Sequence, residues 1–180
     1  AISPNGLYLI TGGLDKSLKL SEIDTRINVK DFIGHTNVAG DICFSSDNNV
    51  FATAGWDKKV RIWDMVSGLQ INKLVGHKGA VFSIDIDVED KYIVSGSDDK
   101  TARLWNFKTG KLIKTFSGHN GAITYVKITP DGKRLITSSR DGSVKIWNLE
   151  SGEEILTHFS LSENESSFIP ILKLLFSIHK

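Results

Sequence analysis

The sequence predicts an all-β protein built from repeated four-stranded antiparallel sheets, and three observations predict it. The dipeptide Gly-His occurs three times, and its histidines, His35, His77 and His119, are 42 residues apart. An aspartate and then a tryptophan follow each of these histidines at fixed distances. Short apolar segments alternate with turn residues inside every unit. Self-similarity at such a period is typical of repeat architectures, so the repeat determines the fold class before any propensity argument.

The unit from residue 77 to 118 shows how one repeat divides into strands. Acidic and glycine-containing turns separate its apolar segments, which predict strands at 80–86, 92–95, 101–105 and 112–116. The third segment of each unit alternates apolar and polar residues with the period of two that a half-buried strand requires. No stretch before residue 160 has a helical period long enough to compete.

Four strands in each 42-residue repeat match the blade of a propeller, whose small twisted sheets cover one another's faces. The spacing predicts a repeat array over 1–159, with an incomplete blade at 1–33 and complete blades at 34–75, 76–117 and 118–159. The incomplete blade contains Thr11 and Asp15 but has Ser21 and Glu22 where the other units have tryptophan followed by Asp or Asn.

These motifs resemble those of the WD-repeat (WD40) family of β-propellers. The resemblance covers residues 1–159 and rests on Gly-His, the central aspartate and the closing Trp-Asp or Trp-Asn, which coincide in register three times. It implies that the first strand of each blade lines a central axis and that the fourth forms the rim. Since such propellers usually close with about seven blades, we expect an open arc of about four blades, an incomplete propeller.

Composition excludes several function classes. Lys and Arg number 22 against 21 for Asp and Glu, and this net charge of +1 does not favour a nucleic acid or an anionic membrane as the default partner. The single cysteine, Cys43, lies among apolar residues and is expected in the core. No secretory signal opens the chain, so a reducing location, cytoplasmic or nuclear, is expected.

Each complete unit repeats a set of four side chains that could be mistaken for a catalytic triad. The sets are His35, Thr53, Asp57 and Trp63; His77, Ser95, Asp99 and Trp105; and His119, Thr137, Asp141 and Trp147. A hydrolase needs an exposed nucleophile and oxyanion donors, and one active site rarely occurs in three copies. The resemblance implies instead a buried chain of hydrogen bonds from the indole through the hydroxyl and imidazole to the carboxylate. We therefore expect neither catalysis nor a cofactor.

The resemblance also implies where partners bind. In this family, partner contacts on the top face come from three positions in each blade, and these positions hold Val38, Gly40 and Trp56; Ala80, Phe82 and Asp98; Ala122, Thr124 and Arg140; and Leu14 in the first blade. Trp56 is the most informative of them, because a large exposed aromatic residue is a usual energetic anchor of an interface. The alternative is that Trp56 lies flat on its own blade and Phe82 plugs the axial channel.

Four acidic residues, Asp85, Asp87, Glu89 and Asp90, lie close together at the end of an innermost strand. They could bind a cation. We expect instead solvated charges at the mouth of the channel and on the lower surface, with Lys127 as a counter-charge and no metal site.

Residues 160–180 leave the repeat register. Their apolar part, 168–178, is shorter than a membrane span and contains Lys173, which disfavours a transmembrane helix. Two alternatives remain open, a short amphipathic helix that starts near Pro170 and docks on a blade or a partner, and a non-native segment.

The function that these features predict is a non-catalytic scaffold that holds other proteins or peptides in a complex, for example in signal transduction. The alternative is a substrate-recognition or regulatory domain of a larger protein. Ubiquitin-ligase adaptors in the family often carry arginine at the positions that hold Val66, Lys108 and Glu150 here, so that signature is absent. An RNA- or chromatin-associated propeller would lead one to expect a basic patch, which the charge balance does not suggest. No small-molecule substrate is indicated.

Overall fold

The computed structural model describes residues 1–159, and these residues form strands without any helix. The strands are β1 (Tyr8–Gly12), β2 (Leu18–Glu22), β3 (Asn28–Phe32), β4 (Ala39–Phe44), β5 (Val50–Gly55), β6 (Lys59–Asp64), β7 (Gln70–Val75), β8 (Val81–Ile86), β9 (Tyr92–Ser97), β10 (Thr101–Asn106), β11 (Leu112–Ser117), β12 (Ile123–Ile128), β13 (Arg134–Ser139), β14 (Ser143–Asn148) and β15 (Glu154–Phe159). The all-β prediction is confirmed. The expectations for 160–180 lie outside the described residues.

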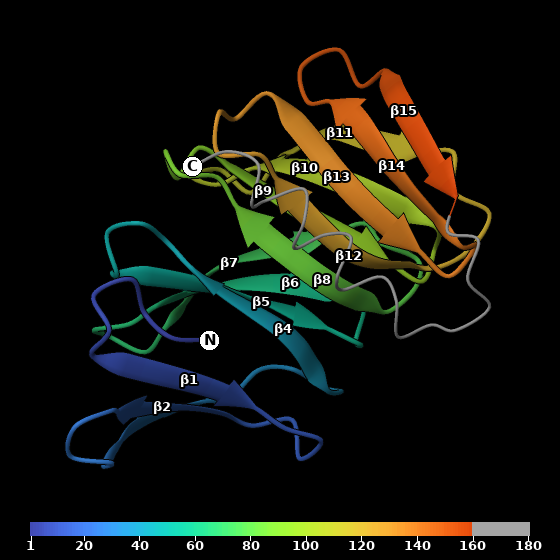
Figure 1. Cartoon of the computed structure of the whole chain (residues 1–180). Helices are drawn as coiled ribbons and strands as arrows, with labels where there is room; N and C mark the ends of the chain where they lie inside the picture. Colours follow the sequence, from blue (N-terminus) through green and yellow to red (C-terminus); the bar gives the residue numbers. More distant parts are fainter. Residues whose placement is uncertain (160–180) are drawn as a thin grey trace.

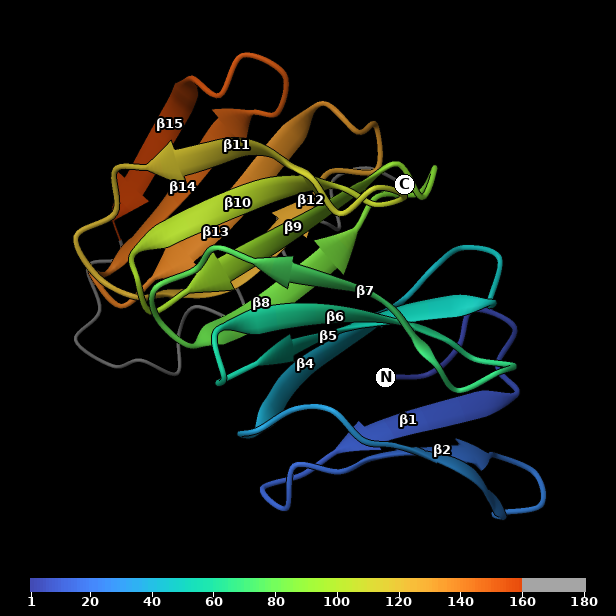
Figure 2. The ribbon, with the colours of Figure 1, turned by 180° about the vertical axis from the view of Figure 1, so that it is seen from behind.

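The strands form four antiparallel sheets, each made of strands consecutive in the chain: β1–β3, β4–β7, β8–β11 and β12–β15. The sheets stack face to face in chain order, and Figures 1 and 2 show the sheet of β1–β3 and that of β12–β15 at opposite ends of the stack. This arrangement of open sheets is consistent with WD40 blades and fits an incomplete propeller. No helix in residues 1–159 has the length and apolar character needed to cross a membrane.

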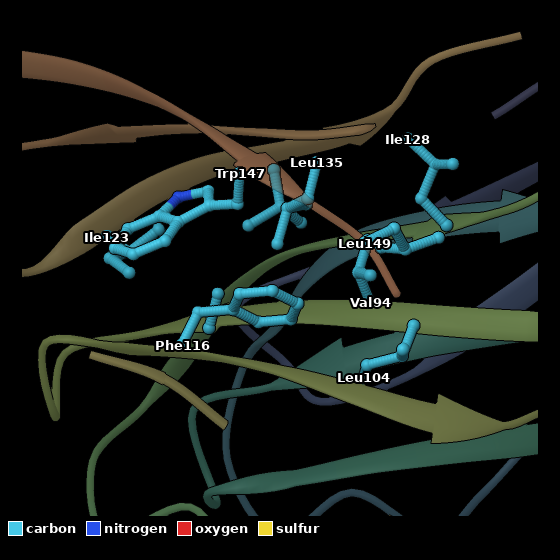
Figure 3. Close-up of a cluster of buried hydrophobic side chains, with 10 residues drawn as sticks. Val94, Leu104, Phe116, Ile123, Ile128, Leu135, Trp147 and Leu149 are labelled. Carbon is cyan, nitrogen blue, oxygen red and sulfur yellow. The ribbon is translucent and has the colours of Figure 1, made fainter. Parts of the chain in front are cut away.

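The core lies between the sheets, because the facing side chains of neighbouring blades bury one another. Figure 3 shows this layer between the last two blades, where Phe116 of β11 lies close to Trp147 of β14. Other members of the layer are Val94, Leu104, Ile123, Ile128, Leu135 and Leu149. Phe116 and Trp147 meet edge to face with ring centroids 5.7 Å apart. Such interdigitation fixes each blade against the next.

Hydrogen bonds between side chains and backbone join the innermost strands β4, β8 and β12. The Asp41 carboxylate accepts from the backbone N–H of Ile84 at 2.9 Å. One blade further on, the Ser83 hydroxyl accepts from the backbone N–H of Val126 at 3.3 Å. Because the two contacts are related by the repeat, they set the register between successive blades.

The expectation of solvated acids at the channel mouth was wrong for Asp85 and Asp87, which are 5% and 7% exposed. Asp85 accepts from Lys127 Nζ at 2.5 Å and from the backbone N–H of Ile128 at 2.8 Å. Asp87 accepts from the backbone N–H groups of Lys91 and Tyr92. Asp85 is thus an inter-blade link with the expected counter-charge, and Asp87 closes a turn.

Candidate functional site

A chain of four hydrogen-bonded side chains runs through the third blade. The indole Nε1–H of Trp105 donates to Ser95 Oγ at 2.8 Å, and this hydroxyl donates to His77 Nε2 at 2.8 Å. His77 Nδ1–H in turn donates to the Asp99 carboxylate at 2.8 Å. Strand β9 supplies the hydroxyl and β10 the indole, so the network ties the two central strands of the sheet to the loop that precedes its first strand.

The second and fourth blades repeat the same network. From indole to carboxylate its three contacts measure 2.9, 2.8 and 3.0 Å in the second blade and 2.9, 2.7 and 3.0 Å in the fourth. The hydroxyls of Thr53, Ser95 and Thr137 are completely buried, and each is bonded on both sides. A hydroxyl in this setting is not accessible to a substrate, whereas full hydrogen bonding is the condition under which polar groups can be buried.

The carboxylates of these networks are held ionised. Burial by itself would raise the pKa of Asp99, but hydrogen bonds from His77, Thr101 and the backbone N–H of Lys78 outweigh it, and the pKa is well below its usual range. The pKa of Asp141 and that of Asp57 are lowered in the same way. Burial lowers the pKa of His35 and of His119, so these imidazoles are neutral near pH 7.

The acidic residues of β8 and the turn after it do not converge on a cation. Within residues 1–159, no group of three or more His, Cys, Asp or Glu side chains is arranged to hold a metal ion. Asp90, the last member of the cluster, accepts from the backbone N–H and the hydroxyl of Ser46 in the preceding blade.

Most of the predicted partner-binding residues lie at a β-bulge in the first strand of a blade or at the adjacent turn between its second and third strands. β-Bulges place Gly40, Phe82 and Thr124 as the extra residues at the start of β4, β8 and β12. The tight turn between the second and third strands carries Trp56, Asp98 and Arg140, whose backbone N–H groups donate to the carbonyls of Val38, Ala80 and Ala122. A bulge re-aims the inserted side chain, and bulges occur often beside functional sites.

Three of these side chains form a continuous series across three blades. The rings of Trp56 and Phe82 meet edge to face with centroids 6.0 Å apart. On the other side, the guanidinium carbon of Arg140 lies 5.4 Å from the centroid of Phe82. We call this series the Trp56–Phe82–Arg140 row.

Trp56 lies against its own blade and also reaches the surface. A Cβ atom added at Gly40 would lie 3.0 Å from Trp56 Nε1, so the indole does lie against β4 of its own blade. The side chain nevertheless remains 43% exposed. Around the row, Asp98, Thr124 and Arg140 are exposed, Val38 and Phe82 are half-buried, and Leu14 is 82% exposed.

Sequence reasoning missed Arg61 as a member of the second network. Arg61 Nη1 donates to the Asp57 carboxylate at 2.8 Å from a side chain that is nearly fully buried. A signal was present, because a basic residue recurs at this position in every unit, as Lys19, Arg61, Arg103 and Lys145. No comparable sequence pattern predicts the contact between Phe82 and Arg140, since the two residues belong to different units.

Comparisons with known proteins agree with this architecture. The family model described as WD40, the WD domain or G-beta repeat, matches residues 1–20, 26–64, 68–106 and 110–148. Over 44 residues the chain is 43% identical to the U3 snoRNP-associated protein-like EMB2271 of Arabidopsis thaliana and 41% identical to the U3 snoRNP-associated protein-like YAO of the same organism. Each of these matches covers 24% of this chain and 9% of the relative. Since the four matched segments cover most of its length, the chain belongs to the WD40-repeat family.

Proposed function

We propose that this chain is a non-catalytic scaffold that holds other proteins or peptides on its top face, which consists of Leu14, Val38, Trp56, Phe82, Asp98, Thr124 and Arg140. WD40 repeats commonly mediate protein–protein interaction, and the family is generally non-catalytic. The observation that carries the proposal is the Trp56–Phe82–Arg140 row, which joins three blades on one surface.

The chemistry of the row suits an interface anchor. Tryptophan and arginine are enriched among residues whose truncation costs more than about 2 kcal/mol of binding energy. The contacts of both residues with Phe82 orient the indole and the guanidinium before a partner arrives, which reduces the side-chain entropy lost on binding. Exposure of Trp56 leaves apolar area that a partner can cover.

The test is affinity capture with the full chain and two single variants, Trp56→Ala and Arg140→Ala. We expect each variant to lose partners that the wild-type chain retains. Val66→Ala is the matched control, because Val66 is 80% exposed in the turn between β6 and β7, at the other end of the blade. If both top-face variants retain every partner, the proposal is wrong.

A second candidate is membership of a ribonucleoprotein assembly in the nucleus, and the similarity to the two U3 snoRNP-associated proteins favours it. Each match is about as long as one repeat, so it is direct support for a similar repeat and weaker support for membership of the same assembly. Crosslinking and capture of the full chain in cells tests the candidate. Recovery of U3 snoRNP components supports it, and their absence alongside other captured proteins contradicts it.

A further inference from the structure

A lysine of the outermost strand joins neighbouring blades at two of the three junctions. Lys30 Nζ of β3 donates to the backbone carbonyl of Val66, and Lys114 Nζ of β11 donates to the backbone carbonyl of Glu150. In both cases the acceptor lies in the turn between the third and fourth strands of the next blade. The two contacts are separated by two repeats, so they are one feature of the array.

A glycine provides the space for each lysine. A Cβ atom added at Gly68 would lie 2.7 Å from Lys30 Cδ, and one added at Gly152 would lie 2.6 Å from Lys114 Cδ. Both glycines have φ near the left-handed region, at 78° and 82°. The methylene stem therefore crosses directly over the turn before its ammonium group reaches the carbonyl.

The middle junction differs because the corresponding residue of β7 is Asn72. Its carboxamide lies over Gly110, where an added Cβ atom would be 2.4 Å from Asn72 Nδ2. The side chain is shorter than lysine, and its Oδ1 accepts from the backbone N–H of Lys73. The carbonyl equivalent to those of Val66 and Glu150 belongs to Lys108.

A cavity of about 350 Å³ lies at this junction, between strands β6 and β7 of the second blade and the β8–β9 and β10–β11 turns of the third. Its lining consists of Ile62, Ile71, Asn72, Asp90, Phe107 and Lys108. Asp90 has an uncharged counterpart in the other junctions, since the repeat places Asn48 and Gly132 there. The middle junction thus combines an apolar wall with a carboxylate at a position where the other junctions have an uncharged residue.

We propose that this cavity, the Asn72 cavity, binds the lysine side chain of a partner polypeptide. Its stem would pack on Ile62 and Phe107, and its ammonium would meet the Lys108 carbonyl and the Asp90 carboxylate. The array itself identifies the occupant, because the chain's own lysines bind the equivalent carbonyls at the two other junctions. The proposal is independent of the top face, so either can fail alone.

The exposed ammonium group of Lys108 is a like charge beside the site. This charge lowers the affinity of the cavity for a second ammonium group. The equivalent residue of the last junction is Glu150, so the fold accepts an acidic residue at this position. Lys108→Glu should therefore tighten binding by several-fold, because the substitution leaves the backbone carbonyl in place and reverses the nearby charge. Asp90→Asn, which copies Asn48, should weaken it.

The test is an NMR titration of the full chain with n-butylammonium chloride, with sodium chloride and n-butanol as controls for ionic strength and for the apolar stem. We expect saturable shifts of the backbone amides of 108–110 and of the Asn72 carboxamide, with a Kd on the order of 10 mM for so small a ligand. Asn72→Lys should abolish the response, since the new ammonium group would occupy the Lys108 carbonyl as Lys30 and Lys114 occupy the equivalent carbonyls. Asn72→Ser keeps the cavity open and should retain the response.

Each outcome of the titration either supports the proposal or overturns it. An equal response to n-butanol, no saturable response in the wild-type chain, or an undiminished response in Asn72→Lys overturns the proposal. Should Asn72→Lys fail to fold, the opposite effects of Lys108→Glu and Asp90→Asn decide, and equal affinities in the two variants overturn it. Loss of top-face partners in Trp56→Ala has no bearing on this result.

Discussion

The guanidinium group of Arg61 lies 2.8 Å from the carboxylate of Asp57, and this ion pair adds a fifth side chain to the buried network of the second blade. The repeat uses the same basic position differently elsewhere. Arg103 lies over the ring of Trp105, with its guanidinium carbon 5.9 Å from the centroid, and Lys145 pairs with Glu154 at 2.8 Å. The four-residue network is thus common to the complete blades, whereas the contact made by the basic residue beside it differs from blade to blade.

Arg61→Met should destabilise the fold more than Arg103→Met. Asp57 and Arg61 have side chains that are 3% and 5% exposed, so removing the arginine leaves a buried carboxylate without its cation, at a cost of about 2–4 kcal/mol. Arg103 loses a cation–π contact that contributes about 0.5–1 kcal/mol. Urea unfolding of both variants measures the difference, and equal losses would show that the ion pair contributes nothing of its own.

Thr137→Val should cost about 2–4 kcal/mol of unfolding free energy. Valine keeps the shape of threonine but removes the hydroxyl, which leaves Trp147 Nε1 without an acceptor and His119 Nε2 without a donor. The matched control is Thr115→Val on the exposed side of β11, where a change within about 0.5 kcal/mol is expected. Calorimetric or denaturant unfolding checks the pair, and a loss no greater than the control's would contradict the structural role of the network.

The repeat period predicted the strands and picked out the members of the networks, and the family resemblance implied that hydrogen bonds join those members. Predicted and observed strands of the third blade differ by no more than two residues at either end. The reason is physical, because a buried network needs the same donors and acceptors at the same spacing in each blade. The four residues joined by hydrogen bonds in each complete blade are those that the period brings into register.

Contacts between blades were less accessible to sequence reasoning. The sequence predicts Lys127 as the counter-charge of Asp85, but only the packing of β8 on β12 reveals that the Asp85 carboxylate is buried. Likewise, nothing in the sequence places Arg140 over Phe82, since the two belong to different repeats and each lacks a counterpart of its own type in the other units. Such contacts follow from the stacking angle of the sheets, which a one-dimensional pattern does not contain.

Stability should fall with acid in two separate ranges of pH. Burial lowers the pKa of His35 and His119 in the folded chain, so the unfolded chain takes up their protons first, and stability is lost as pH falls below about 6.5. The lowered pKa values of Asp57, Asp99 and Asp141 add a second loss as pH falls below about 4.

Thermal unfolding between pH 8 and pH 3 measures this profile. His119→Gln should reduce the pH dependence of stability in the upper range, and Asp141→Asn should reduce it in the lower range. Each substitution also lowers stability by an amount that does not depend on pH. The two variants serve as controls for each other. A wild-type profile that rises as pH falls from 7 to 5 would contradict the burial of neutral imidazoles.

Lys127→Met should destabilise the fold near pH 7, and Asp85→Asn should restore most of the loss in the double variant. The Asp85 carboxylate is buried, and burial raises its pKa despite the opposing effects of the Lys127 ammonium and the backbone N–H of Ile128. Burial by itself would lower the pKa of Lys127, but the Asp85 carboxylate outweighs it, and the pKa is raised. Without the lysine, the pKa of Asp85 should rise further, because an unpaired buried charge is costly.

The sign of the pH dependence follows from this shift. A carboxyl group whose pKa is raised in the folded state stabilises it at low pH, and that contribution is lost as pH rises through the raised pKa. The deficit of Lys127→Met relative to wild type should therefore be about 1–3 kcal/mol at pH 7 and should shrink toward pH 4. In the double variant the difference should be independent of pH, since asparagine does not titrate. A deficit of equal size in the single and double variants would show that Lys127 contributes by packing its stem against the inner strands and that its charge does not link β8 to β12.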